Sequence, residues 1–283
     1  MKIIKSINNN IVSCIDDAGS EVIAMGRGLG YATRAGQVLE ETRVEKIFRM
    51  NTPTQTERMK ELFASLPEEQ IELCTHIIAY AKETLNKKLN QNVYLTLTDH
   101  IGFAIRRLQE GMEFHNALYT EVKIFYPQEF AVGKYALSLV RKELHVTLPE
   151  DEAASIALHL VNAQFDTSIS ETLRVTQVLH DVMEILDGCK ELALDPASPY
   201  YDEFIIHLKF LALRVFSAEP ETRPEENFVT LIRKTYPVEY ACADKIIAYL
   251  EIQSNHPVSD EKRAYLAVHI CRVNQKNEGE KNE

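Results

Sequence analysis

A duplication in the last two thirds of the chain restricts its fold more than any other feature of the sequence. The segment YPQEFA at residues 126–131 recurs as YPVEYA at 236–241, and IALHL at 156–160 recurs as LAVHI at 266–270. Both pairs are separated by 110 positions. We therefore expect two homologous domains in tandem, each long enough to bury a core of its own.

Both copies have the apolar spacing that is typical of α-helices. From Thr54 onward, apolar residues recur three or four positions apart, as in Ile71, Cys74, Ile77, Ile78, Ala81 and Leu85. The proline of each repeated YP segment suits the first position of a helix. We expect two all-α helical bundles, at 54–168 and 169–283, with a break near 166–170. The last residues, about eight of them, are expected to be disordered, as chain ends often are.

The first fifty residues have a different composition. Half of the ten glycines lie between residues 19 and 36, and no proline occurs before Pro53. Short runs of β-prone residues alternate with turn residues, and these runs are 2–7, 11–15, 21–25 and 43–50. This pattern predicts a small antiparallel sheet of about four strands in a domain at 1–53. Such a sheet covers little apolar surface, so we expect this domain to dimerise.

The net charge of −11 argues against nucleic-acid binding when it is taken as an average, because phosphate binding needs Lys and Arg. The charge is unevenly distributed, however. Residues 1–50 hold seven Lys and Arg against six Asp and Glu, a net charge of +1, so the remainder carries −12. The average charge therefore does not exclude nucleic-acid binding by a small, nearly neutral N-terminal module.

The sequence also indicates where the protein acts. Its longest apolar stretches are far shorter than the roughly 20 residues that a membrane-spanning helix needs. The N-terminus has neither the apolar core nor the cleavage site of a signal peptide. The five cysteines form no CxxC motif, which is typical of free thiols in a reducing compartment. We expect a cytoplasmic protein without membrane insertion.

Four of the nine histidines are repeated. The pattern HxxFxxxR begins at His100 and again at His207, and the second histidine of each copy is His159 or His269. The two histidines of a copy lie on different predicted helices, which a bundle can bring together. Arg107 follows His100, and Arg214 follows His207, about 10 Å further along the same helix face. Each arginine suits either a salt bridge or a phosphate contact.

Several roles are open to these histidines. They could be core residues, metal ligands, general acids or bases, or acceptors of a phosphoryl group. The HxxxH and HExxH patterns of metal sites are absent, and no nucleophile motif or dinucleotide fingerprint accompanies the histidines. A phosphate adds about −1.5 to −2 charges, enough to repel or recruit a facing surface. Histidines near a dimer interface would then act as switches.

Two sets of features together resemble one known family. They are the duplicated histidine units and the N-terminal motifs Lys5-x-x-Asn8-Asn9-Asn10 and Met25-Gly26-Arg27-Gly28-Leu29. The family is that of the transcriptional antiterminators of bacterial sugar operons (BglG/LicT type). The resemblance covers essentially the whole chain. It implies a co-antiterminator RNA-binding domain followed by two phosphotransferase-system regulation domains, PRD1 and PRD2. It also implies a homodimer that binds a leader-RNA hairpin, the ribonucleic antiterminator, and prevents formation of a terminator. The RNA-contact positions of the family correspond to Lys5, Asn8, Asn10, Gly26, Arg27 and Tyr31, where phenylalanine is usual at position 31.

By the same resemblance, the histidines are phosphorylation sites. His100 and His159 would be phosphorylated by a sugar permease, enzyme II, which inactivates the protein. His207 and His269 would be phosphorylated by the phosphocarrier HPr, which activates it. The acid that precedes His100 in the family is present as Asp99, but Ile206 stands before His207. Either another acid, with Glu203 as the candidate, or no acid at all assists His207. The resemblance implies no catalytic residue, no cofactor and no metal.

Two other functions remain open from the sequence. One is a DNA-binding regulator that carries the same histidine domains behind a helix-turn-helix, which the glycine-rich, β-prone front end disfavours. The other is a metal-dependent enzyme built on the histidine pairs, which stoichiometric metal in the purified protein would reveal. The sequence identifies neither the sugar nor the RNA.

Overall fold

The computed structural model describes residues 1–196, 198–216 and 226–274. The chain divides into two compact units, Met1–Thr172 and Leu173–Glu283, which are described separately below. The last residues, about eight, for which disorder is expected lie within 275–283, outside the described residues.

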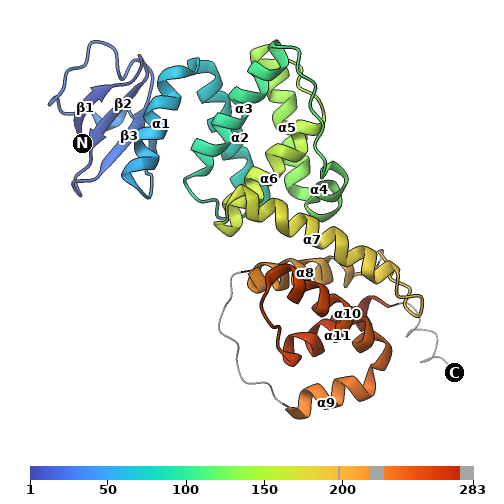
Figure 1. Cartoon of the computed structure of the whole chain (residues 1–283). Helices are drawn as coiled ribbons and strands as arrows, with labels where there is room; N and C mark the ends of the chain where they lie inside the picture. Colours follow the sequence, from blue (N-terminus) through green and yellow to red (C-terminus); the bar gives the residue numbers. More distant parts are fainter. Residues whose placement is uncertain (197, 217–225, 275–283) are drawn as a thin grey trace. The chain divides into compact units, whose positions relative to one another are not determined.

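The N-terminal part of the first unit is an antiparallel sheet with the strand order β1-β2-β3-β4 (Figure 1). The strands are β1 (Lys2–Ser6), β2 (Ile11–Ile15), β3 (Glu21–Met25) and β4 (Lys46–Phe48). The prediction of a small four-stranded sheet followed by helices is confirmed. The predicted extent of the last strand, 43–50, was wrong: Glu41–Arg43 form a turn of 3-10 helix, so the strand begins only at Lys46.

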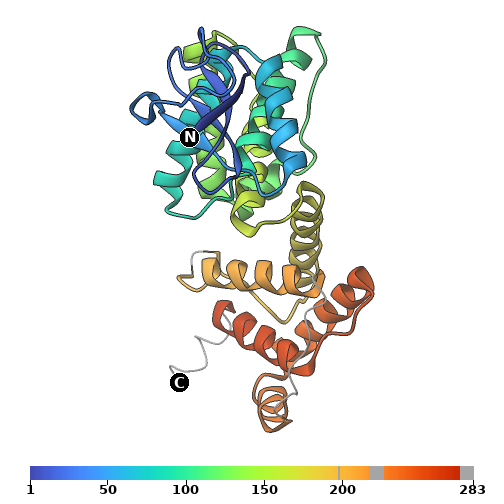
Figure 2. The ribbon, with the colours of Figure 1, turned by 90° about the vertical axis from the view of Figure 1, so that its left-hand side faces the viewer.

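Both faces of the sheet are covered. On one face, Val12, Cys14, Val22 and Ala24 pack beneath Leu29 of the following loop. On the other face, Phe48 is buried with its ring centroid 5.2 Å from that of Phe63 in α1 and 5.1 Å from that of Tyr94 in α3. Figure 2 shows the strands beside α1 in a turned view. The sheet is thus joined to the first helices by a shared apolar core.

Six helices follow in the first unit: α1 (Pro53–Ser65), α2 (Glu68–Leu85), α3 (Val93–Gln109), α4 (Tyr119–Phe125), α5 (Pro127–Leu144) and α6 (Asp151–Phe165). The side-chain oxygen of Thr52 accepts a hydrogen bond from the Gln55 amide, and Pro53 occupies the first turn, so α1 begins at a well-capped end. At the other end of the bundle, Asp166 adopts a left-handed conformation and stops α6. Helices α3 and α6 pack against each other and carry the first histidine pair.

The second repeat has the same order of helices: α7 (Ile169–Asp187), α8 (Tyr201–Phe216), α9 (Glu226–Thr235), α10 (Pro237–Ser254) and α11 (Asp260–Val273). Helix starts correspond between the two repeats: Pro237 begins α10, just as Pro127 begins α5. Helices α8 and α11 pack together and carry the second histidine pair. Among the described residues, no helix is both long and apolar enough to cross a membrane.

Candidate functional site

Backbone and side-chain hydrogen bonds join two loops at one end of the sheet. The carbonyl oxygen of Asn10 accepts a hydrogen bond of 2.9 Å from the Gly26 amide, and its side-chain Oδ1 accepts one of 2.6 Å from the Gly28 amide. The side-chain Oδ1 of Asn8 accepts a bond of 2.9 Å from the Asn10 amide. One surface region therefore contains Asn8, Asn10, Gly26 and Arg27. Tyr31 follows Arg27 in the same loop.

Glycine is required where this region approaches the rest of the domain. A Cβ on Gly26 would clash with the carbonyl oxygen of Arg43, and Gly28 adopts a φ of +64°. Arg43 in turn donates a hydrogen bond of 2.9 Å from Nη2 to the Gly28 carbonyl oxygen. The tight loop leaves the side chain of Arg27 in solvent and that of Tyr31 74% exposed. An exposed tyrosine ring and a guanidinium are suited to stacking on unpaired bases.

Lys5 differs from the other predicted RNA-contact residues. It is an exposed residue of β1, paired in register with Ser13, next to an irregularity between Ile3 and Lys5. It therefore projects from a strand, whereas the other five positions lie in the two loops. A lysine at this position can contact phosphate although it does not belong to either loop.

The amides of Asn8 and Asn10 are also tied to the helices. Nδ2 of Asn10 donates a hydrogen bond of 2.7 Å to Oε2 of Glu68 in α2, and Nδ2 of Asn8 donates one of 3.3 Å to the carbonyl oxygen of Phe63 in α1. Glu68 and Arg43 could not be predicted from the sequence, since contacts between distant positions, such as the 58 that separate Asn10 from Glu68, leave no local pattern.

In the first repeat the two predicted histidines meet, with the ring centroids of His100 and His159 4.7 Å apart. Nε2 of His100 donates a hydrogen bond of 3.0 Å to Oε2 of Glu152, and the guanidinium of Arg107 donates to the other oxygen of the same carboxylate. Glu152 is 1% exposed. One buried carboxylate on α6 thus links a histidine and an arginine on α3.

His159 lies deeper than its partner. Burial, reinforced by His100 nearby, lowers the pKa of His159 to about 3, so its ring is neutral at physiological pH. Its buried Nδ1 has no hydrogen-bond partner among the described residues. A neutral imidazole retains the lone pair that a nucleophile or a ligand requires.

Asp99, the acid that the resemblance places beside His100, points elsewhere. It is exposed and lines a hollow with Arg58 and Glu61 of α1. Adjacent residues of a helix diverge by about 100°, which explains the separation. Glu152 contacts His100 instead, from 52 positions away, a separation that no local sequence pattern reveals.

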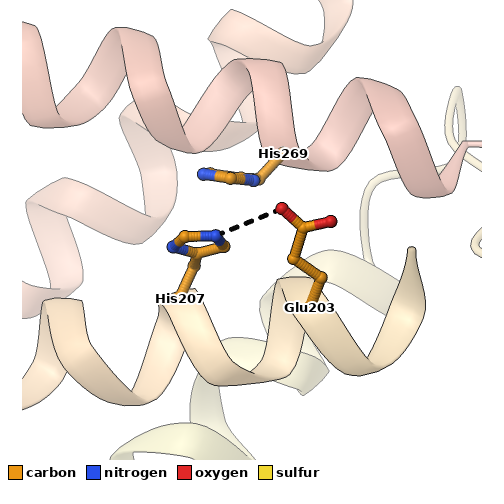
Figure 3. Close-up of side chains that lie close together, drawn as sticks. All are labelled: Glu203, His207 and His269. Carbon is orange, nitrogen blue, oxygen red and sulfur yellow. Dashed lines mark ion pairs between the residues drawn. The ribbon is translucent and has the colours of Figure 1, made fainter.

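In the second repeat the two predicted histidines are stacked, with the ring centroids of His207 and His269 3.9 Å apart and the ring planes at 25°. Glu203 lies one turn before His207 on α8, and its Oε1 is 3.5 Å from Nε2 of His207 (Figure 3). The same oxygen pairs with Nη1 of Arg272 at 3.2 Å. Burial, reinforced by His207, lowers the pKa of His269. The acid named from the sequence for this repeat therefore reaches its histidine.

The second pair is also one of two places among the described residues where a metal ion could be held. One ligand atom each from Glu203, His207 and His269 lies within 4.8 Å of the others. Arg272 competes for the Glu203 carboxylate, however, and a guanidinium beside a metal ligand opposes cation binding. The arrangement of these side chains therefore fits reactions at the imidazole nitrogens better than it fits binding of a metal ion.

Three regions of the chain match known domain families. Residues 1–57 match the family of the CAT RNA binding domain, and residues 75–163 and 185–273 each match the PRD domain family. The chain is 38% identical over 273 residues to the transcription antiterminator LicT of Bacillus subtilis (strain 168), covering 96% of this chain and 99% of LicT. It is also 38% identical over 273 residues to the beta-glucoside operon antiterminator of Dickeya chrysanthemi, covering 96% of each. The crystal structure of GlcT CAT-PRDI aligns with a TM-score of 0.52 and 29% identity, over 58% of this chain and 97% of that one.

Proposed function

Because this chain belongs to the family of transcription antiterminators that join a CAT RNA-binding domain to two PRD domains, we propose that it controls a sugar-utilisation operon by antitermination. As a dimer it binds a hairpin of the leader RNA and prevents a terminator from forming. Residues 1–53 are the RNA-binding domain, 54–168 are PRD1 and 169–283 are PRD2. The protein acts in the cytoplasm and has no catalytic activity of its own.

The joined loops at the end of the sheet are the observation that carries the RNA-binding proposal. Asn10 accepts two hydrogen bonds from the loop that contains Gly26 and Arg27, and its own amide donates one to Asn8, next to the exposed ring of Tyr31. Amides and aromatic rings recognise unstacked bases of RNA loops, and arginine adds contacts to phosphate and base. Lys5 contributes a further cation from β1. Two copies of this surface in a dimer would read the two sides of a hairpin.

Phosphoryl transfer to histidine supplies the switch in this proposal. A ring nitrogen with a free lone pair attacks the phosphorus of a donor phosphohistidine, the P–N bond of the donor breaks, and a new P–N bond forms. The acceptor ring loses its N–H proton, and the released donor imidazole gains one, so that charge and atoms balance. The acceptor must therefore be neutral, as the lowered pKa of His159 and of His269 ensures at physiological pH.

We further propose that the two repeats respond to different donors with opposite effects. Phosphorylation of His100 and His159 by the sugar permease inactivates the protein when the sugar is absent. Phosphorylation of His207 and His269 by HPr activates it. The different surroundings of the two pairs support this assignment. The carboxylate that links His100 to an arginine is buried, whereas Glu203, which contacts both His207 and Arg272, is 45% exposed.

RNA binding by the full chain tests the proposal. Arg27→Ala should weaken binding of the leader hairpin by about tenfold or more, the loss expected for one charge-assisted contact. Arg34→Ala is the matched control, because Arg34 is also exposed in the same domain. Fluorescence anisotropy of a labelled hairpin measures both. Equal affinity of the Arg27 variant and the unchanged protein would reject this surface as the RNA site.

A further inference from the structure

One ring nitrogen of His100 is held by a buried carboxylate. Nε2 of His100 lies 3.0 Å from Oε2 of Glu152, which is 1% exposed. The other oxygen of Glu152 pairs with the guanidinium of Arg107, as a carboxylate anion does. Because a carboxylate anion only accepts hydrogen bonds, Nε2 of His100 must carry the proton. A neutral His100 ring then has its lone pair on Nδ1.

The other ring nitrogen of His100 is open. Among the described residues, Nδ1 of His100 has no hydrogen-bond partner. Nδ1 of His159 also lacks a partner but is buried, whereas Nδ1 of His100 reaches solvent. The first repeat therefore presents one nitrogen lone pair, that of His100, from which a donor can be reached.

Arg107 keeps the carboxylate of Glu152 in place. Its guanidinium carbon lies 3.8 Å from the ring centroid of Phe114 and 5.4 Å from that of Phe103. Cation–π contacts with two rings restrict the arginine that pairs with Glu152. The side chains of His100 and Arg107 are only 16% and 14% exposed. A fixed carboxylate at such a site stabilises positive charge on the imidazole beside it.

The contact that corresponds to it in the second repeat restrains its histidine less. Oε1 of Glu203 lies 3.5 Å from Nε2 of His207, and both side chains are 45% exposed. Water competes for both groups, and a contact of this length is at the limit of a hydrogen bond. The tautomer of His207 is therefore weakly restrained by Glu203.

We propose that Glu152 is a positioning residue that fixes His100 as the Nε2–H tautomer, so that the phosphoryl group is accepted at Nδ1. This inference deepens the function proposed above and rests on phosphorylation of His100. The Nδ1 lone pair attacks the phosphorus, the P–N bond of the donor breaks, and a P–N bond to Nδ1 forms. Glu152 offsets the positive charge that develops on the ring, before the Nε2 proton passes to the released donor imidazole.

Nitrogen-15 NMR of the full chain, labelled at histidine, tests the tautomer without any donor. A His100→Gln variant assigns the resonances of His100. We expect the proton of His100 on Nε2, and Glu152→Gln should shift the tautomer ratio by about tenfold or more, as expected for a lost charge-assisted hydrogen bond. Glu150→Gln makes the same change at an exposed position and should leave the ratio unchanged. A proton mainly on Nδ1 of His100 in the unchanged protein would overturn the inference, whatever the stability of the variants.

Phosphoramidate, a small phosphoryl donor, tests the nitrogen that reacts. Its P–N bond breaks, and ammonia leaves with the Nε2 proton as ammonium. The coupling between phosphorus-31 and nitrogen-15 identifies the phosphorylated nitrogen of His100. The unchanged protein and Glu150→Gln should carry phosphorus on Nδ1, whereas Glu152→Gln should give both isomers.

Three results would overturn the inference: phosphorus on Nε2 of His100, no phosphorylation of His100, or the same isomer ratio in Glu152→Gln as in the unchanged protein. Failure of the sugar permease to phosphorylate His100, while phosphoramidate gives the Nδ1 isomer, would reject the proposed donor instead. The role of Glu152 would then remain supported.

Discussion

Nδ2 of Asn10 donates a hydrogen bond of 2.7 Å to Oε2 of Glu68, which links the proposed RNA-binding surface to the first turn of α2. The neighbouring Asn8 amide donates to the Phe63 carbonyl oxygen in α1 at 3.3 Å. Two amide groups that we assign to RNA recognition are therefore engaged with the first helical repeat. RNA must compete with these contacts.

Removal of the Glu68 carboxylate should strengthen RNA binding. We expect Glu68→Ala to raise the affinity of the full chain for its hairpin by about fivefold, because one hydrogen bond to a charged group no longer has to be broken. The neighbouring Glu69→Ala removes the same charge from an exposed position and controls for general electrostatics. Anisotropy titrations compare the two variants. Equal affinities would show that the Asn10–Glu68 contact does not restrain the surface.

Breaking the carboxylate bridge of the first repeat should destabilise α3 and α6. Glu152→Gln leaves Arg107 without its charged partner, and loss of one member of a largely buried ion pair costs about 3 kcal/mol. Hydrogen exchange of α3 and α6 in the full chain measures the change. Glu150→Gln is the control, since the salt bridge of Glu150 with Lys134 is exposed on both sides and contributes little. Unchanged exchange in Glu152→Gln would contradict the structural role of the bridge.

The first repeat should lose stability as the pH falls. The pKa of His159 is about 3 in the folded protein and returns to about 6.5 on unfolding, so between these values the unfolded chain binds the extra proton. Stability is therefore fully retained above pH 6.5 and decreases below it, by about 2 kcal/mol from pH 6.5 to pH 5.

Hydrogen exchange of α6 at pH 6.5 and pH 5 checks this dependence. A His159→Leu variant should lack the contribution, whereas His115→Gln, at a highly exposed position, should keep it. The same acid sensitivity in the His159 variant and the unchanged protein would show that another group is responsible.

The features that the sequence predicts well are those with local or repeated patterns. The helical periodicity and the Tyr-Pro segments predict the helical bundles. The β-prone runs between turn residues predict the four strands. The fourth strand is shorter than predicted, because a 3-10 turn at Glu41–Arg43 precedes it. The pairing of His207 with His269 was inferred from the duplication, and the structure brings their rings together.

The partners of these groups were harder to predict. Asp99 is adjacent to His100 in sequence but lies on another face of α3, while Glu152 reaches His100 from a helix 52 positions away. The contact of Glu68 with Asn10 likewise depends on how the sheet packs on α1 and α2. Such contacts are set by tertiary packing, which no local pattern in a single sequence records.

Crosslinking in cells, followed by sequencing of the RNA bound to the full chain, tests whether this protein binds an antiterminator hairpin. We expect the reads to concentrate on one hairpin that overlaps a terminator in the leader of a sugar operon. Arg27→Ala should remove this peak, whereas Arg34→Ala should retain it. Reads spread evenly over transcripts, or an Arg27→Ala profile identical to that of the unchanged protein, would contradict it.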